Sequence, residues 1–225
     1  MKRSLLVSLC SFIAFAACGG CGSDGGGSPD PSVTSLSLRM EPAPEGAASA
    51  CAEHDGLCDC PRGAAMHLTL TARAADGSEV AIDPGAVAWT SSDAASVSVA
   101  SSASGGADVS ALRDLFDAQG AEPSATVTAS YGGLQASMPV TAVIDAHGDW
   151  QAALDIGFTY MLSLSQAGRA VVDTATHYGG SIQNDMMSLT VSGISVNARF
   201  STRTDVSGTY TGPGGLNGTL TCTKQ

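Results

Sequence analysis

The chain is poor in basic residues, in aromatic residues and in large aliphatic side chains, and each shortage excludes something. Ten Lys and Arg stand against 21 Asp and Glu among 225 residues, a formal net charge of −11. Binding to nucleic acid needs a clustered cationic surface. The basic residues here are scattered singly, so nucleic acid is excluded as a partner. Beyond its first residues, the chain also lacks the run of about 20 apolar residues that a membrane-spanning helix requires.

The shortage of large aliphatic side chains bears on whether the chain folds at all. Leu, Ile, Val and Phe together make up about 19% of the residues, just under the roughly 20% associated with disorder. Disorder also requires a high charge density, whereas only 14% of these residues are charged. Ala, Ser, Thr and Gly take the place of the aliphatics in two-residue alternation. This pattern predicts an all-β protein with a thin core of small side chains.

The N-terminal 17 residues have the parts of a signal peptide. Lys2 and Arg3 precede an apolar stretch at 5–17 that is too short to span a membrane. The run FAAC at 15–18 resembles a bacterial lipobox, which implies that Cys18 is lipidated and becomes the first mature residue. Cys21 is the weaker candidate, and ordinary secretion with Cys18 kept as a thiol is the alternative.

The segment after the signal peptide predicts a flexible tether over residues 18–32. GGCGSDGGGSPDPS at 19–32 is rich in Gly, Ser, Asp and Pro and has no apolar periodicity. Gly19, rather than Asp, after the cysteine resembles outer-membrane sorting in bacteria that use that signal. We therefore expect a lipid-anchored protein of the cell envelope, in the outer membrane.

Residues 33–143 contain short alternating segments at the spacing of a β-sandwich. In MHLTLTARA (66–74), Met66, Leu68 and Leu70 fall on one face of the strand, and His67 and Arg73 on the other. Turn clusters separate the segments, and none alternates with an amphipathic helix, which argues against a parallel α/β sheet. The other expected strands are VTSLSLRM (33–40), VAWTSS (87–92), ASVSVA (95–100), ATVTASY (125–131) and LQASMPVTAV (134–143).

This succession of strands resembles a group 2 bacterial immunoglobulin-like domain. In that family a Trp-x-Ser-Ser strand is followed by an Ala/Val-x-Val strand, and an Ala-Thr-Val-Thr-Ala strand precedes the last one. The resemblance implies an immunoglobulin-like sandwich with Trp89 in its core. The chain departs from the family pattern by a cysteine-bearing insertion at 41–63. It departs again at 111–124, where Leu112, Leu115 and Phe116 at helical spacing predict one helical turn capping an open end of the sandwich.

The insertion contains CAEHDGLCDCPRG (51–63), the most unusual local feature of the sequence. Cys51, His54, Cys58 and Cys60 offer the thiolates and imidazole that tetrahedral zinc prefers, although their spacing is not that of a standard zinc knuckle. An exported chain meets oxidising conditions, in which neighbouring cysteines form disulfides. We therefore expect a disulfide, either Cys51–Cys58 or Cys51–Cys60, that closes a loop, with a zinc site as the alternative.

A second alternating series fills residues 145–225 and predicts an antiparallel meander of six or so strands. In FTYMLSLS (158–165) the apolar residues fall on one face, and Ser192-Gly193 is a two-residue hairpin signal. The pattern is similar to small lipocalin-like barrels of bacterial lipoproteins. About eighty residues can close a small barrel filled by side chains, but hardly one with a roomy cavity.

The sequence shows no motif of an enzyme active site, a phosphate-binding loop or an EF-hand. We therefore expect no enzymatic activity and no cofactor. Asp145, His147 and Asp149 form D-x-H-x-D, which fits either a hard-cation site or a polar hinge between the two units.

Two functional hypotheses follow. The first is a non-enzymatic, membrane-tethered surface lipoprotein that acts as a binding, adhesive or display module toward envelope proteins or glycans. The alternative is a small-ligand carrier that uses the C-terminal barrel. A filled barrel favours display, whereas a pocket of a few hundred Å3 favours a carrier. The expected pocket residues are Phe158, Tyr160, Phe200 and Tyr210.

Overall fold

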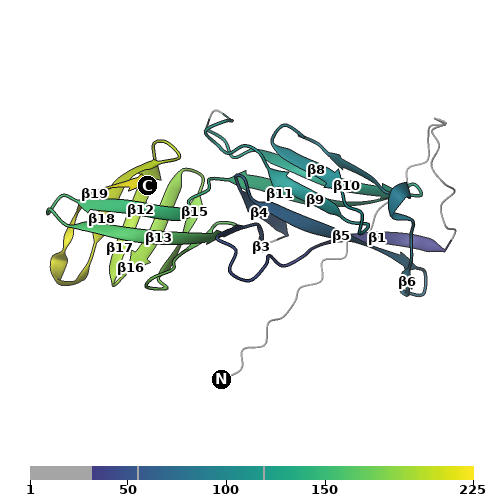
Figure 1. Cartoon of the computed structure of the whole chain (residues 1–225), viewed down its shortest axis with the longest axis horizontal. Helices are drawn as coiled ribbons and strands as arrows, with labels where there is room; N and C mark the ends of the chain where they lie inside the picture. The colour runs from purple at the N-terminus through teal and green to yellow at the C-terminus, as the bar shows by residue number, and fades with distance from the viewer. Residues whose placement is uncertain (1–31, 55, 119) are drawn as a thin grey trace, which may run out of the picture.

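The computed structural model describes residues 32–54, 56–118 and 120–225. The predicted signal peptide, Cys18, Cys21 and nearly all of the predicted tether lie outside these described residues. The predicted all-β class is confirmed, since the described part of the chain contains strands and only two short 3-10 turns, Pro84–Ala86 and Pro213–Gly215. Figure 1 shows a β-sandwich, in blue and teal, and a barrel, in green and yellow, placed end to end along the long axis.

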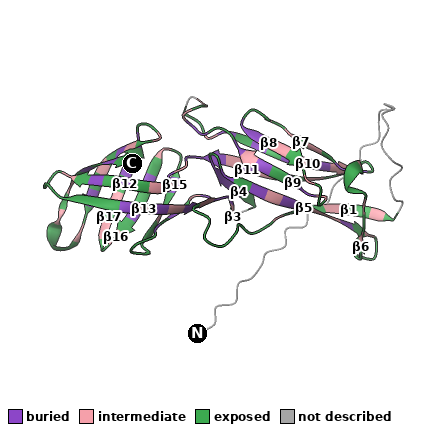
Figure 2. Ribbon diagram, viewed as in Figure 1, coloured by how far each residue is buried: buried purple, intermediate pink, exposed green. Residues whose placement is uncertain are grey.

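The sandwich consists of two sheets whose alternating residues meet in a thin core. Val97 and Val109 of one sheet and Val127 and Val140 of the other are fully buried. Figure 2 shows buried stretches, in purple, on strands of both sheets. The first sheet has the order β1 (Val33–Met40), β5 (Ala65–Ala74), β9 (Ala107–Ala111), β8 (Val97–Ser101), with β6 (Glu79–Val80) beside β5. The second has the order β3 (Ala52–His54), β4 (Leu57–Pro61), β11 (Leu134–Val143), β10 (Ser124–Tyr131), β7 (Ala88–Ser91).

Trp89 is less buried than the expectation of a central core tryptophan requires. Its strand, β7, lies at the edge of the second sheet, paired only with β10. The side chain is therefore half-buried and packs against both apolar clusters of the sandwich from the side. The fully buried tryptophan of the described chain is Trp150, in the barrel, with 1% exposure.

The cysteine-bearing insertion is not the loop that the sequence predicts. β3 and β4 pair in antiparallel register, and β4 pairs in parallel with β11, with Cys58 opposite Val140 and Cys60 opposite Ala142. β4 lies between β3 and β11 in the sheet; Cys58 and Cys60 on it are fully buried, whereas Leu57 at its start is 45% exposed. The insertion therefore extends the second sheet of the sandwich.

The second unit is a closed barrel of eight strands in which each strand pairs with its neighbours in sequence. The barrel closes because β12 pairs with both β13 and β19. The sequence predicted only six or so strands, and it missed β12 and β15, which contain few large apolar residues. The strands are β12 (Gly148–Leu154), β13 (Thr159–Ala167), β14 (Ala170–Asp173), β15 (Gly179–Gln183), β16 (Met186–Val191), β17 (Ile194–Phe200), β18 (Asp205–Thr211) and β19 (Asn217–Lys224).

Two glycines allow this small barrel to curve. A Cβ atom at Gly180 of β15 would collide with the carbonyl oxygen of Ser188 on β16. A Cβ atom at Gly208 of β18 would likewise collide with the backbone of β17 around Ala198. Glycines within strands often mark places where another backbone approaches closely, and they help strands to bend around a barrel.

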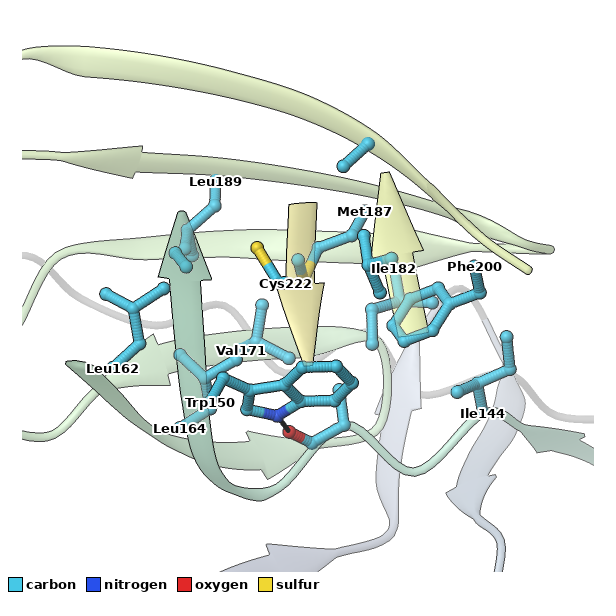
Figure 3. Packing of buried hydrophobic residues seen from close by; sticks show 14 of the residues in the cluster. Ile144, Trp150, Leu162, Leu164, Val171, Ile182, Met187, Leu189, Phe200 and Cys222 are labelled. Atoms are coloured by element: carbon cyan, nitrogen blue, oxygen red, sulfur yellow. Dashed lines mark hydrogen bonds between the residues drawn. The ribbon is translucent and has the colours of Figure 1, made fainter. Parts of the chain in front are cut away.

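The half of the barrel next to the sandwich is filled by side chains. Trp150 packs edge-to-face on Phe200, with 6.0 Å between the ring centroids, and Ile144 lies in the same cluster. The indole N–H of Trp150 donates a 2.8 Å hydrogen bond to the carbonyl oxygen of Ala146 (Figure 3). This pairing satisfies the one polar atom of a buried indole.

Candidate functional site

The two ends of the barrel differ in what surrounds them. The strand directions place the turns at 168–169, 184–185 and 201–204 at one end, which we call the proximal end because it contacts the sandwich. The turns at 155–158, 174–178, 192–193 and 212–216 lie at the opposite, distal end. A ligand can enter only where the barrel is not covered, so each end is considered in turn.

The proximal end is sealed by a loop of the sandwich. Leu115 is buried in the apolar cluster of the barrel, and Phe116 packs against the same cluster. The sequence predicted a helical turn here that caps the sandwich. The observed segment forms hydrogen-bonded turns, with Ala118 N donating to Asp114 O at 3.2 Å, and its apolar side chains cover the barrel instead.

An arginine from the barrel holds this loop in place. Arg203 donates from Nε and Nη2 to the two carboxylate oxygens of Asp114, at 2.8 and 3.0 Å, and also contacts Asp117 at 2.6 Å. The Asp114 side chain is 1% exposed. These hydrogen bonds raise the pKa of Arg203 further above its usual range and lower that of Asp117. We call these three residues the Arg203 cluster.

A second ion-pair group, the Arg169 cluster, joins the barrel to the sandwich nearby. Arg169 forms a bidentate pair with Glu122, at 3.0 and 2.7 Å, and its Nε lies 3.1 Å from Asp59 on β4. Burial raises the pKa of Asp59 although Arg169 acts in the opposite direction. The Asp59 side chain is 4% exposed, so this ion pair ties the cysteine hairpin to the barrel.

A short strand also crosses from the sandwich to the barrel wall. β2 (Ser49–Ala50) pairs in parallel with Gln166 and Ala167 of β13. Cys51, the next residue, forms a disulfide with Cys60 on β4. The disulfide therefore connects a strand on the barrel to a strand of the sandwich, and Cys51–Cys60, one of the two predicted pairings, is confirmed.

This disulfide removes two of the four side chains that a zinc site would need. Of the other two, Cys58 is buried within 3.1 Å of the Met66 sulfur, and His54 is exposed. Burial raises the pKa of the Cys58 thiol to about 12, which disfavours a thiolate ligand. Among the residues that the structure describes, no group of three or more His, Cys, Asp or Glu is placed to hold a metal ion.

The D-x-H-x-D segment is hydrogen-bonded to the barrel wall. Gln166 is buried and accepts a hydrogen bond from Ala146 N at 2.6 Å while donating to Ile144 O at 2.8 Å. The Asp145 carboxylate forms a 2.5 Å hydrogen bond with His147 Nδ1. Asp149 accepts a hydrogen bond from a serine on β13. The linker is thus fixed to the barrel wall, and both of its carboxylates already have partners.

The distal half of the barrel contains a cavity of about 280 Å3. Buried residues such as Leu162 and Cys222 form its floor, and exposed residues such as Met161 and Ser192 also line it, so it reaches the surface at the distal end. Its lining is mostly apolar: Ala152, Leu154, Tyr160, Met161, Leu162, Asp173, Ala175, Thr176, Met187, Leu189, Val191, Ser192, Ile194, Val196, Tyr210, Leu220 and Cys222.

The polar groups of the cavity are few, and most are already hydrogen-bonded. Tyr210 donates from its hydroxyl to Asp155 Oδ1 at 2.8 Å. Asp173 accepts hydrogen bonds from the backbone N–H and the hydroxyl of Thr176, and its pKa is lowered because these bonds outweigh the opposing effect of burial. Burial raises the pKa of the Cys222 thiol to about 11, so the thiol is neutral at physiological pH.

Large apolar side chains are exposed at the distal end of the barrel, where the cavity opens. Ile156 and Phe158 in one distal turn and Tyr178 in another are 50%, 60% and 43% exposed. Tyr160 and Met161, at the start of β13, are also exposed and line the cavity. We call these five residues the apolar rim. Soluble domains seldom gather so many large apolar side chains at one end without a binding role.

The predicted pocket residues divide between the two ends of the barrel. Tyr160 and Tyr210 line the cavity, whereas Phe158 stands on the rim and Phe200 packs beneath Trp150 near the proximal end. The sequence analysis missed the lining residues on β16 and β17, although Val191 and Ile194 flank the predicted Ser192-Gly193 hairpin. Both hairpin residues have positive φ, 50° and 80°, as such a turn requires.

A second depression, of about 330 Å3, lies outside the barrel beside the linker. It is lined largely by small residues, including Gly46, Ala47 and Ser165, together with His147 and Asp149 of the linker segment. The described part of the chain contains no helix long and apolar enough to cross a membrane.

Comparisons with known proteins do not assign the chain to a family. No protein-family model matches it, and no curated protein matches it. A crystal structure of the S-layer protein rSbsC aligns with 83% of this chain and 22% of its own chain, at 20% sequence identity and a TM-score of 0.32. A superposition of that quality supports no conclusion about fold or function, and this chain spans about a fifth of that protein.

Proposed function

We propose that this protein is a lipid-anchored binding protein of the cell envelope, in which the sandwich is a rigid spacer and the barrel binds a small ligand. The observation that carries the proposal is the cavity of about 280 Å3 at the distal end of the barrel. Ligand sites are usually largely preformed, mostly apolar concavities of roughly 300–1,000 Å3, and this cavity is slightly smaller than the lower bound of that range. An eight-stranded barrel is also the size that can hold one small ligand.

The arrangement of the two units supports binding at the distal end. Leu115 and the Arg203 cluster close the proximal end, so only the distal end is accessible. β1 begins on the side of the sandwich away from the barrel, so the tether before it would leave the cavity mouth facing away from the anchor (Figure 1). The lipobox at 15–18 supports the anchor, and the group 2 immunoglobulin-like resemblance supports a spacer role for the sandwich.

The test of ligand binding is native mass spectrometry on protein isolated from its own envelope under gentle conditions. We expect a bound small molecule that is absent from Ala175→Trp, because Ala175 is exposed at the mouth of the cavity and a tryptophan there would block it. Ala170→Trp is the matched control. Ala170 is the first residue of β14, the strand that precedes Ala175, and it is exposed but does not line the cavity. Retention of the same molecule by both variants would place it elsewhere and contradict the proposal.

The anchor is tested separately on the same material. The proposal expects an acyl mass on Cys18 and its loss in Cys18→Ala. Intact protein that sediments with membranes but carries no acyl mass would contradict the anchor and leave the ligand site untouched.

A second candidate function is adhesion or display through the apolar rim. Its five large side chains form a surface that a partner protein could cover, and Phe158 is the most exposed of the aromatic ones. This candidate predicts that Phe158→Ser weakens partner binding while leaving the cavity ligand in place.

A further inference from the structure

The basic residues of the barrel lie at its proximal end, whereas acidic residues occur at both ends. Its four lysine and arginine residues each pair with a carboxylate at or near the proximal end: Arg169 with Asp59 and Glu122, Arg199 with Asp185, Arg203 with Asp114 and Asp117, and Lys224 with Asp145. The distal turns at 155–158, 174–178, 192–193 and 212–216 contain no lysine or arginine.

The cavity itself carries only negative charge. Asp173 is the one carboxylate among its lining residues, and its lowered pKa keeps it ionised at neutral pH. Cys222 and Tyr210 are neutral there because burial raises the pKa of each. Asp155, just outside, adds a second carboxylate at the distal end, and its pKa is also lowered, mainly by the hydrogen bond from Thr219 N. His177 stands in the 174–178 turn and does not line the cavity.

A charged ligand would therefore find no favourable partner in the cavity. An anion entering it would lose its hydration and meet Asp173 with no lysine, arginine or histidine among the lining residues to compensate. A cation would find the Asp173 carboxylate already holding the hydroxyl and N–H of Thr176 and the N–H of Ser163. An uncharged molecule with an apolar body meets neither penalty.

From this charge distribution we infer that the distal cavity takes an uncharged, largely apolar molecule and rejects organic anions, including carboxylates of otherwise suitable shape. This inference rests on the proposed function, because it names the class of ligand for the same site. It predicts selectivity by charge rather than by shape.

The sharpest test compares two fluorescent probes that differ by one sulfonate group. N-phenyl-1-naphthylamine is uncharged, and 8-anilino-1-naphthalenesulfonate is the related anion. Both are titrated into the mature chain, residues 18–225 with Cys18→Ser so that no acyl group competes. We expect the uncharged probe to bind at least ten times more tightly, and Ala175→Trp to abolish its binding.

A gain of anion binding provides the complementary test. Tyr160→Arg places a cation at the cavity mouth, because Tyr160 is 47% exposed and lines the cavity. It should raise the affinity for the anionic probe at least tenfold. Val172→Arg adds the same charge on the outer wall, where Val172 is 37% exposed and does not line the cavity, and should leave that affinity unchanged.

The outcomes separate the ligand class from the binding function. Binding of the anionic probe as tight as that of the uncharged probe, and blocked by Ala175→Trp, would overturn the charge inference and leave the proposed function standing. Failure of both probes to bind, or binding that Ala175→Trp does not affect, would overturn the cavity as a binding site and with it the proposed function.

Discussion

The Arg203 cluster offers a quantitative test of how firmly the barrel is joined to the sandwich. In Arg203→Ala, the Asp114 carboxylate keeps its hydrogen bond from Phe116 N at 2.9 Å but loses its compensating charge. Breaking a buried ion pair costs about 3–5 kcal/mol of unfolding free energy. Because the Arg203 side chain is 38% exposed, water screens part of this loss, and we expect about 2–3 kcal/mol.

A neighbouring arginine supplies the matched control. Arg199 pairs with Asp185 at the same end of the barrel, but its side chain is 70% exposed. Both partners of this ion pair belong to the barrel, so the pair does not join the barrel to the sandwich. Exposed pairs of this kind contribute about 0–1 kcal/mol, so Arg199→Ala should leave stability nearly unchanged.

Differential scanning calorimetry measures both variants. For a chain of this size, 1 kcal/mol shifts the melting temperature by about 2–4 °C, so Arg203→Ala should melt about 4–12 °C lower. A double-mutant cycle with Asp114→Ala isolates the pair itself, and we expect a coupling energy above about 1 kcal/mol. If Arg203→Ala and Arg199→Ala lower the melting temperature equally, the Arg203 cluster does not join the two units.

Three further predictions concern the cap, the disulfide and acid stability. Leu115→Ala should cost about 2–5 kcal/mol of unfolding free energy because it leaves a hole in the barrel core, whereas Leu112→Ala, at a 45% exposed position in the same loop, should cost little; urea unfolding compares them. Reducing Cys51–Cys60, which are nine residues apart, should cost about 3 kcal/mol in chain entropy, and hydrogen exchange should rise chiefly in β2, β3 and β4. The pKa of Asp155 is lowered in the folded state, first by the hydrogen bond from Thr219 N. The ionised Asp155 therefore stabilises the fold above its unfolded-state pKa of about 4, and this stabilisation is lost as the pH falls through its lower folded-state pKa. Asp155→Asn should therefore melt lower at neutral pH and lose less stability as the pH falls below about 4; an unchanged acid profile would contradict this role.

The sequence predicted the all-β class and most strands because alternation of apolar and polar residues is a local signal. It found β1 at Val33–Met40 and β11 at Leu134–Val143 with the bounds that the structure has. β15 was not predicted because its sequence GGSIQ contains only one large apolar residue, Ile182. Its position depends on pairing with β14 and β16 on either side.

The site was harder to predict because it depends on contacts between distant segments. Leu115 and Phe116 were recognised as an apolar pair, but nothing local indicates that they cover the barrel rather than their own sandwich. The cavity likewise exists because seven strands bring small and medium side chains together at one end. The disulfide could be narrowed to two pairings by compartment and spacing, and only the β3–β4 register distinguishes Cys60 from Cys58.

The pairing of β1 with β5 has a mechanical consequence. β1 starts at Val33, opposite Ala74, on the side of the sandwich away from the barrel (Figure 1). If the segment before Val33 is anchored and the barrel mouth holds a partner, tension enters along the axis of β1. Hydrogen bonds between antiparallel strands are perpendicular to the strands, so the rungs from Val33 to Met40 would bear this load together, in shear, instead of opening one after another. Beyond Met40 the same load reaches the barrel through β2 and the Cys51–Cys60 bond. We therefore expect the sandwich and the barrel to resist pulling together, as one unit.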